Sequence, residues 1–362
     1  MLAGLLCLAC TSEEAPGASE SESEGGESGG TSETGDTGTP EPPIPFEPIE
    51  CPEVEPDVAR ERLCVEAADP DNAPDPIFID CATESACFGP SEPEPVSELV
   101  LGIYNMERGL ELDGQLELFG GDPRVPDFDV LLISEADRGC SRSGARNVTR
   151  ELAEAMAMHY VFAVEYTELP RAGEPEVAIE STCEHGNAVL SRFPLGNVEV
   201  IRHAANSDVW VGNPEQPRLG GRVAVKADVL VGDRIVHVYS LHFESGDAED
   251  MRTAQALELL DHADALPFEV VIGGDANTLA YVIDLTQGGP IDEPTVRAFL
   301  DRGYVDTHGE LPVNERATVT MFGGVIDLIF TRGAIGSAPG LCSIPDCGAL
   351  SDHVPVWATI SI

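Results

Sequence analysis

Basic residues are scarce in this chain of 362 residues, which carries 20 Lys and Arg against 65 Asp and Glu, a formal net charge of -45. Residues 1–96 hold 23 of the acids and two Arg, so residues 97–362 keep 42 acids and 18 bases, a balance of -24. Because proteins bind nucleic acids largely through basic residues that neutralise phosphates, long duplex DNA is a disfavoured partner. The composition would still allow DNA to bind if the basic residues were gathered in one local cleft.

Long apolar runs are also missing. The run in residues 1–10, MLAGLLCLAC, is too short to span a bilayer and lacks the basic start of a signal peptide. It resembles the end of a bacterial lipoprotein signal, with Ala9 before a cysteine, although Leu8 and Cys7 fit that signal less well. We therefore expect lipidation at Cys10 and an export signal that is clipped or starts upstream. A secretory signal cleaved nearby is the alternative.

Residues 11–50 contain Ser, Glu, Gly, Thr and Pro with almost no aliphatic side chains. Such a segment cannot bury enough apolar surface to offset the entropy lost on ordering, so we expect a disordered tether. Its acidity favours an extended chain held away from anionic lipid.

Cys-x-x-Cys pairs and clustered histidines are absent, which disfavours the competing interpretation of a zinc site. Eight cysteines remain beyond residue 10, and an even number in an exported chain favours disulfides. We expect Cys342 to pair with Cys347 and Cys140 with Cys183. The other four would staple a small Pro-rich appendage over residues 51–96, with three connectivities possible: Cys51, Cys64, Cys81 and Cys87.

With 42% hydrophobic residues the chain can bury a full core, and residues 97–362 are predicted to form the catalytic domain. Helices are predicted over Asn147–Met158 and Ala248–Leu266, and Gly232-Asp233 is typical of a hairpin turn. Many strands and few long helices predict two stacked sheets with helices outside. The expected strands are Leu99–Met106, Asp129–Ser134, Tyr160–Tyr166, Gly186–Ser191, Arg222–Val231, Arg234–Phe243, Glu269–Gly273, Thr318–Met321, Val325–Phe330 and Pro355–Ile360.

Polar side chains lie at or just past the end of a β-like apolar stretch in six segments of the chain. Since residues at strand ends stand on rigid edges, six such edges can converge on one pocket. That set predicts a metal-dependent phosphoester hydrolase. The six segments are Tyr104-Asn105, Ser134-Glu135, Leu241-His242, Gly274-Asp275-Ala276-Asn277, Ile326-Asp327 and Ser351-Asp352-His353.

A magnesium site is expected at Glu135, a hard oxygen ligand that ends the run Val130–Ile133. The alternative, an exposed loop acid, fits that position poorly. Asn105 could support the same ion with its carbonyl oxygen, although a lone asparagine at a strand end is more often a turn former.

Acid-base chemistry is expected around Asp275. Asp275 and Asn277 would share one face if extended, so the carboxylate could orient or deprotonate water while the amide donates to a phosphoryl oxygen. Asp352 and His353 would face opposite ways, with Asp327 fixing the His353 tautomer. His242 could donate to a non-bridging oxygen. Taken singly, these residues would be read as turn formers or satisfied core histidines.

Residues 97–362 resemble the endonuclease/exonuclease/phosphatase superfamily, in motifs that run in the family's order. That resemblance implies a four-layer α/β/β/α sandwich, an α/β fold of two mixed sheets flanked by helices. The motifs are Ile103-Tyr-Asn-Met-Glu107, Asp129-Val-Leu-Leu-Ile-Ser-Glu135, His185-Gly-Asn-Ala-Val-Leu-Ser-Arg192, Tyr239-Ser-Leu-His242, Gly273-Gly-Asp-Ala-Asn277, Ile326-Asp327 and Ser351-Asp-His353.

The resemblance also implies roles residue by residue. Asn105, Glu135 and Asp352 match its metal-site positions. Positions for water, phosphate and proton transfer match Asp275, Asn277, His242, Asp327 and His353, while Asn187 and Arg222 are candidate substrate contacts that packing explains equally well. Tyr104 stands where the family often has Trp, and Ala276 where it has a larger residue, which leaves the pocket's shape open.

The sequence thus predicts an exported, monomeric, lipid-anchored or secreted protein of a bacterial cell envelope. It would hydrolyse a phosphodiester or a phosphomonoester with the help of Mg²⁺. Mn²⁺ and Ca²⁺ are the alternative ions. An extracellular nuclease is the nearest rival hypothesis, because the fold does not choose a substrate. A non-catalytic Ca²⁺-binding surface module is a third, disfavoured because every motif position is filled.

Overall fold

A computed structural model describes residues 45–52, 62–64, 81–168, 183–206, 218–267, 269–278, 293–312, 315–321 and 323–362. The predicted lipidation site Cys10 and most of the predicted tether, residues 11–50, lie outside these ranges. The chain divides into two units, Met1–Ile44 and Pro45–Ile362, and the description below concerns the second.

The first sheet has eight strands in the order β1-β4-β5-β3-β2-β14-β13, with β7 also paired to β4. It is mixed, since β2 and β3 run parallel while the other pairs are antiparallel. Its strands are β1 (Glu84–Cys87), β2 (Glu98–Asn105), β3 (Val130–Arg138), β4 (His159–Glu168), β5 (Glu184–Ser191), β7 (Arg218–Gly220), β13 (Ile335–Leu341) and β14 (Val356–Ser361).

The second sheet has six strands in the order β11-β12-β10-β9-β8-β6, and only β9 and β10 are parallel. Its strands are β6 (Leu195–Arg202), β8 (Val223–Val231), β9 (Arg234–His242), β10 (Val270–Asp275), β11 (Val305–Asp306) and β12 (Asp327–Arg332).

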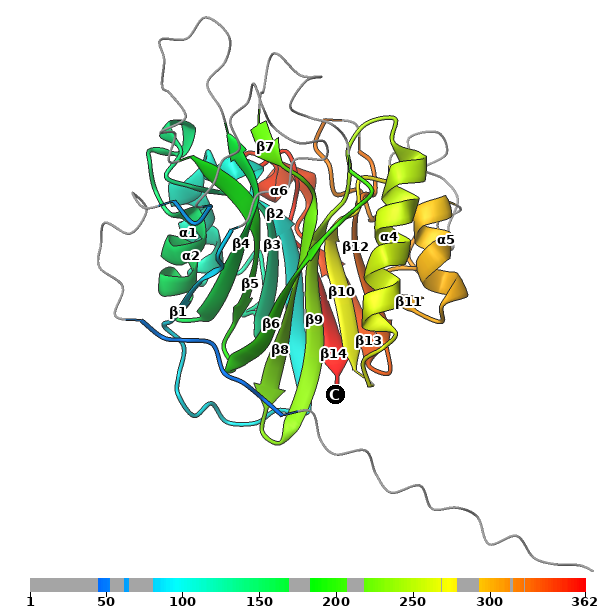
Figure 1. Ribbon diagram of the computed structural model, residues 1–362, viewed down its shortest axis with the longest axis horizontal. Coiled ribbons are helices and arrows are strands. Elements are labelled where there is room, and N and C mark those ends of the chain that lie inside the picture. The colour runs from blue at the N-terminus through cyan, green and yellow to red at the C-terminus, as the bar shows by residue number, and fades with distance from the viewer. Residues whose placement is uncertain are drawn as a thin grey trace, which may run out of the picture. The chain divides into compact units, whose positions relative to one another are not determined.

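Helices cover the outer face of each sheet (Figure 1), so the described part of the chain has four layers, as predicted. Alternation along strands produces this: Leu131 and Ile133 pack toward α1 and α2, while Val130 and Leu132 face the second sheet. On the far side α4 and α5 cover the second sheet. The helices are α1 (Leu112–Phe119), α2 (Val148–Ala155), α4 (Glu249–Ala263), α5 (Pro294–Asp301) and the short α6 (Ile344–Cys347), with 3-10 turns at Glu107–Gly109 and Ser141–Ser143.

One predicted strand is wrong. Within Thr318–Met321 only Val319 makes an isolated bridge, to His353, and Thr320 and Met321 form a turn. Conversely, β13 went unpredicted because its sequence, IGSAPGL, has no apolar alternation and its side chains are mostly exposed or half-buried. The hairpin turn at Gly232-Asp233 is confirmed between β8 and β9.

All eight cysteines beyond residue 10 form disulfides, as predicted. The two expected pairs, Cys140–Cys183 and Cys342–Cys347, are confirmed. Of the three open connectivities, the structure has Cys51–Cys87 and Cys64–Cys81. These two bonds lie beside β1, which extends the first sheet by pairing with β4. Across the described ranges, no helix combines the length and apolar character needed to cross a membrane.

Candidate active site

Asp275 stands at the centre of the site because of strand register. It ends β10, with His242 opposite it on β9 and Asp327 opposite it on β12. Gly274 allows this approach: its φ is 142°, and a Cβ there would lie 2.1 Å from the Leu241 carbonyl oxygen. Burial raises the pKa of the Asp275 carboxyl, and Asp327 raises it further, while His353 and His242 oppose the shift.

His353 and Asp327 form the first imidazole-carboxylate pair. His353 Nδ1 lies 2.8 Å from Asp327 Oδ2, and its Nε2 lies 3.7 Å from Asp275 Oδ2. Burial alone would lower the pKa of His353, but Asp327 and Asp275 outweigh it and raise the pKa to about 10. The imidazole is therefore a cation at neutral pH, with Nε2 directed at the central carboxylate.

His242 belongs to a second pair that the sequence did not reveal. Its Nδ1 lies 3.3 Å from Glu165 Oε2, and its Nε2 lies 3.7 Å from Asp275 Oδ2. Arg222 donates to Glu165 at 2.8 Å and lies 2.8 Å from His242 Nδ1. Burial raises the pKa of Glu165, but Arg222 and His242 outweigh it and lower the pKa to about 2. The available signal was an acid inside the apolar strand run Tyr160–Tyr166.

Glu135 does not end its strand, contrary to prediction. β3 continues to Arg138, and the register slips between Ile133 and Ala136, where Glu135 has φ 54°. Such bulges re-aim side chains beside active sites. Its Oε1 lies 3.8 Å from His242 Nε2. Burial opposes ionisation of Glu135, yet His242, His185 and Arg108 hold its pKa well below the usual range.

Asp352 lies on an acidic rim with Glu107, a residue for which the sequence predicted no role. The Asp352 backbone N–H donates to Glu107 Oε2 at 2.9 Å. Burial raises the pKa of Asp352, and Glu135 and Asp275 add to that shift. Burial and Asp352 likewise raise the pKa of Glu107. These carboxylates destabilise one another's ionised forms, as a site built for a cation does.

The amides behave differently from expectation. Asn105 Oδ1, the predicted ion ligand, accepts from the Glu107 N–H at 3.0 Å, while Nδ2 donates to Asp275 Oδ2 at 3.0 Å. Asn277 is not extended: its φ is 52°, and its backbone N–H donates to Asp275 Oδ1 in an Asx turn. Its Nδ2 donates to the Phe243 carbonyl. Asn187 Nδ2 donates to the Val223 carbonyl, a packing role.

Among the described residues, one group of three offers ligand atoms close enough to hold a single metal ion: Asp275, Asp327 and His353, within 4.8 Å of one another. Outside this group, Glu135 raises the pKa of Asp352, whose backbone N–H donates to Glu107. The structure thus brings every predicted catalytic and metal residue to one edge of the sandwich, while dividing the carboxylates between an inner and an outer set.

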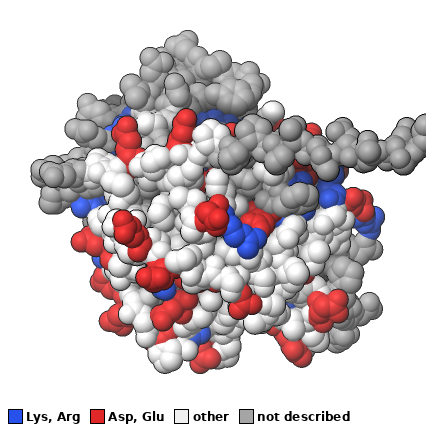
Figure 2. Space-filling view, turned by 90° about the horizontal axis from the view of Figure 1, so that it is seen from below, with Lys and Arg blue, Asp and Glu red and all other residues white. Residues whose placement is uncertain are grey.

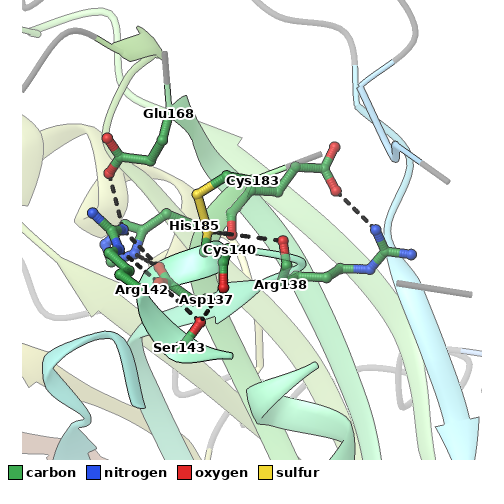
Figure 3. Close-up of a disulfide and its surroundings, with 9 residues drawn as sticks. Asp137, Arg138, Cys140, Arg142, Ser143, Glu168, Cys183 and His185 are labelled. Carbon is green, nitrogen blue, oxygen red and sulfur yellow. Dashed lines mark hydrogen bonds and ion pairs between the residues drawn. A yellow bond between two sulfur atoms is a disulfide. The ribbon is translucent and has the colours of Figure 1, made fainter. Parts of the chain in front are cut away.

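A network of charged side chains surrounds Asp137, two residues after Glu135 on β3 (Figure 3). Asp137 lies 2.9 Å from His185 Nδ1 and accepts two hydrogen bonds from Arg142, at 2.6 and 2.7 Å. Arg142 also pairs with Glu168 at 3.1 Å. The Cys140–Cys183 disulfide joins the two segments that carry these side chains. These ion pairs and the disulfide therefore hold this side of the site in place.

Residues 104–353 match the model of the Endonuclease/Exonuclease/phosphatase family. The chain belongs to this family. Members of this family are phosphoesterases and nucleases that generally use divalent metal ions. The family match spans the motifs from Tyr104 to His353 that meet at Asp275.

Individual relatives narrow the activity no further. The uncharacterized protein YbhP of Escherichia coli K12 is 31% identical over 182 residues, 49% of this chain and 63% of the relative; YbhP of Shigella flexneri gives the same values. The chain thus spans less than two thirds of these relatives. An endonuclease/exonuclease/phosphatase from Beutenbergia cavernae is similar in fold, with TM-score 0.57 and 20% identity over 74% of this chain and 72% of that one.

Proposed function

We propose that this enzyme hydrolyses a phosphodiester or phosphomonoester by in-line attack of water, with a divalent cation, Mg²⁺ first, at the site. One observation carries the proposal: Asp275 Oδ2 lies 3.7 Å from both His353 Nε2 and His242 Nε2, and accepts from Asn105 at 3.0 Å. One carboxylate between two held imidazoles is suited to deprotonating water while cations stabilise the phosphoryl charge.

The donor set fits a divalent cation. Glu135, Asp352 and Glu107 are oxygen ligands, which Mg²⁺ prefers, and the last two have raised pKa values because of burial and neighbouring carboxylates. A bound cation would relieve that repulsion. Glu135 and Asp352 would hold it, and it would neutralise phosphoryl charge as a Lewis acid.

The remaining work falls to the chain's own residues. Asp275 accepts a proton from the attacking water, and its raised pKa makes it a better base than an exposed aspartate. His353, a cation held by Asp327, donates to a non-bridging phosphoryl oxygen. His242, held by Glu165, does the same from the other side. Asn105 keeps Asp275 in place.

Long duplex DNA is a disfavoured substrate in this proposal. Residues 97–362 carry a balance of -24, and a field of this sign opposes the approach of a polyanion. Asp and Glu are also spread over the face in Figure 2, with Lys and Arg at a few places, although that face is the lower end of Figure 1, opposite the end at which β9 reaches His242. Small or membrane-presented phosphoesters are the preferred class. An extracellular nuclease would instead cut plasmid fast at low salt and lose rate steeply as salt rises.

The cellular place proposed is outside the cytoplasm, with the chain monomeric and anchored by lipid at Cys10. Four disulfides support the first part, since such bonds persist in oxidising compartments. Mass analysis of the protein from native membranes tests the anchor. A diacylglycerol adduct on Cys10 supports it, and an unmodified Cys10 contradicts it.

Turnover of a substrate panel tests the activity: bis-p-nitrophenyl phosphate, plasmid, sphingomyelin and inositol phosphates, each with Mg²⁺, Mn²⁺, Ca²⁺ or EDTA. At least one phosphoester should be cleaved with Mg²⁺ and spared in EDTA. Asp275→Asn should lose that rate, whereas Asp233→Asn, in the exposed turn between β8 and β9, should keep it. Full activity in EDTA would remove the metal, and Ca²⁺ binding without turnover would favour the binding-module hypothesis.

A further inference from the structure

Arg218 stands beside the candidate active site without a carboxylate partner. It begins β7, which pairs with β4 at the upper end of the sandwich in Figure 1. Its guanidinium carbon lies 3.8 Å from the centre of the Tyr166 ring, and that of Arg222 lies 5.6 Å from the same centre. His185 stacks with Tyr166, at 6.5 Å between ring centres. These residues form a basic wall that adjoins His242 through Arg222.

The absence of an ion pair is unusual in so acidic a chain. In the described ranges, the Arg218 side chain makes no hydrogen bond or ion pair, and its Nε is buried without a partner. Glu168 lies directly opposite it in the strand register, but that carboxylate pairs with Arg142 at 3.1 Å. A buried donor of this kind is normally satisfied, so an absent group is expected to satisfy it.

Stacking on the Tyr166 ring leaves the guanidinium N–H groups of Arg218 free to bind an anion. An arginine that lies flat on an aromatic ring keeps its N–H groups around the edge, directed away from the ring and able to grip an anion with two parallel hydrogen bonds. The ring also fixes the guanidinium, so less entropy is lost on binding. Arg218 is therefore a prepared anion ligand.

Arg218 does not contact the residues proposed to face the scissile phosphate, and is linked to them through Tyr166 and Arg222. Arg222 is already engaged by Glu165, at 2.8 Å, and lies against His242. The centre of the Tyr166 ring lies 3.8 Å from the guanidinium carbon of Arg218 and 5.6 Å from that of Arg222, so Arg218 reaches His242 only through these two residues. A group bound by Arg218 therefore belongs to another part of the substrate.

We propose that Arg218 binds a second phosphate group of the substrate, so that the enzyme selects small phosphoesters that carry a phosphate besides the scissile one. The turnover part of this inference rests on the proposed hydrolase function. A single arginine can recognise one additional phosphate group even though the surrounding acidic residues oppose the binding of a long polyanion.

A matched pair of chromogenic substrates tests the inference: thymidine 5′-(4-nitrophenyl phosphate) and the same compound with a 3′-phosphate. Both have the same scissile diester and leaving group. We expect a KM about tenfold lower for the 3′-phosphorylated compound, the usual scale of a charge-assisted contact. Arg218→Gln should abolish that ratio, and Arg218→Lys should restore part of it. Arg302→Gln, at the C-cap of α5, should leave the ratio unchanged.

Equal KM values in the native enzyme, or a ratio that survives Arg218→Gln, would overturn the inference. If neither compound is hydrolysed, the substrate panel described above decides the proposed function, and calorimetry decides the binding question separately. Thymidine 3′,5′-bisphosphate should bind about tenfold more tightly than thymidine 5′-monophosphate, and Arg218→Gln should remove the difference. Equal affinities would mean that Arg218 merely supports the Tyr166 ring.

Discussion

The two sheets make unequal but reciprocal contributions to the site. His353 precedes β14 of the first sheet and is held by Asp327 of the second, whereas His242 ends β9 of the second sheet and is held by Glu165 of the first. Asn105 reaches across in the same way to Asp275. Each functional side chain is therefore oriented by the opposite sheet, so catalysis depends on how the two sheets pack.

Covalent support, by contrast, is found on one side. All four disulfides lie beside strands of the first sheet: two near β1, one between β3 and β5, and one after β13. The second sheet relies on its apolar packing against α4 and α5. The first sheet is thus stabilised by covalent bonds. The second sheet is held against it by the shared apolar core and by the polar pairs at the site.

The largest expected effect comes from cutting the polar links at Asp275. Asp275→Asn and His353→Ala should each lower kcat by about 10²- to 10⁴-fold, the range for a lost acid-base group. The double variant should lose little more, because both residues serve one step. Steady-state kinetics with circular dichroism as a folding control would check this. Losses that multiply would show that the two residues act independently.

Glu135→Gln should also lower turnover by orders of magnitude with the fold intact, because one ligand of the cation is weakened. Excess Mg²⁺ should recover only part of the rate. Undiminished turnover in this variant would contradict its assignment as a ligand.

The sequence predicted the fold and most site residues for different reasons. Apolar alternation located the central strands. Asp275 and Asp327 could be found because each stands at a strand end, and His353 because it lies in a motif shortly before β14. Glu165 and Glu107 were given no role: the first lies inside a strand, and the second was one acid among many. The bulge at Glu135 and the Asx turn at Asn277 depend on strand register and backbone conformation, which local sequence does not encode.

A smaller effect is expected from Glu165→Gln, since Glu165 acts through His242. Turnover should fall about 10- to 100-fold, the scale for partners that orient a functional histidine. The loss of negative charge beside Arg222 should also change the pH profile of kcat, which a purely structural role would not do. A profile identical to that of the native enzyme would mean that Glu165 serves packing alone.

Disulfide removal tests the unequal support of the sheets. Cys140–Cys183 closes 43 residues and Cys342–Cys347 closes five. In the chain-entropy treatment, replacing both cysteines of a pair by Ser costs about 4 kcal/mol for the longer loop and about 2 kcal/mol for the shorter. Urea unfolding of the two double variants would measure the difference. Only the first should also impair turnover, because its bond supports the charged network around Asp137.

The smallest effect is a pH dependence inside the first sheet. Burial lowers the pKa of His159, which begins β4, although its hydrogen bond to the Pro90 carbonyl opposes the shift. The unfolded chain then binds a proton near pH 6.5, its ordinary pKa, while the folded chain does not. Stability from this source is complete above pH 6.5 and is lost as pH falls toward the folded-state value. His159→Gln should therefore flatten the slope of unfolding free energy below about pH 6.5. Above pH 7 the two proteins should differ by a constant amount, and an unchanged slope would mean that the histidine is charged in the fold.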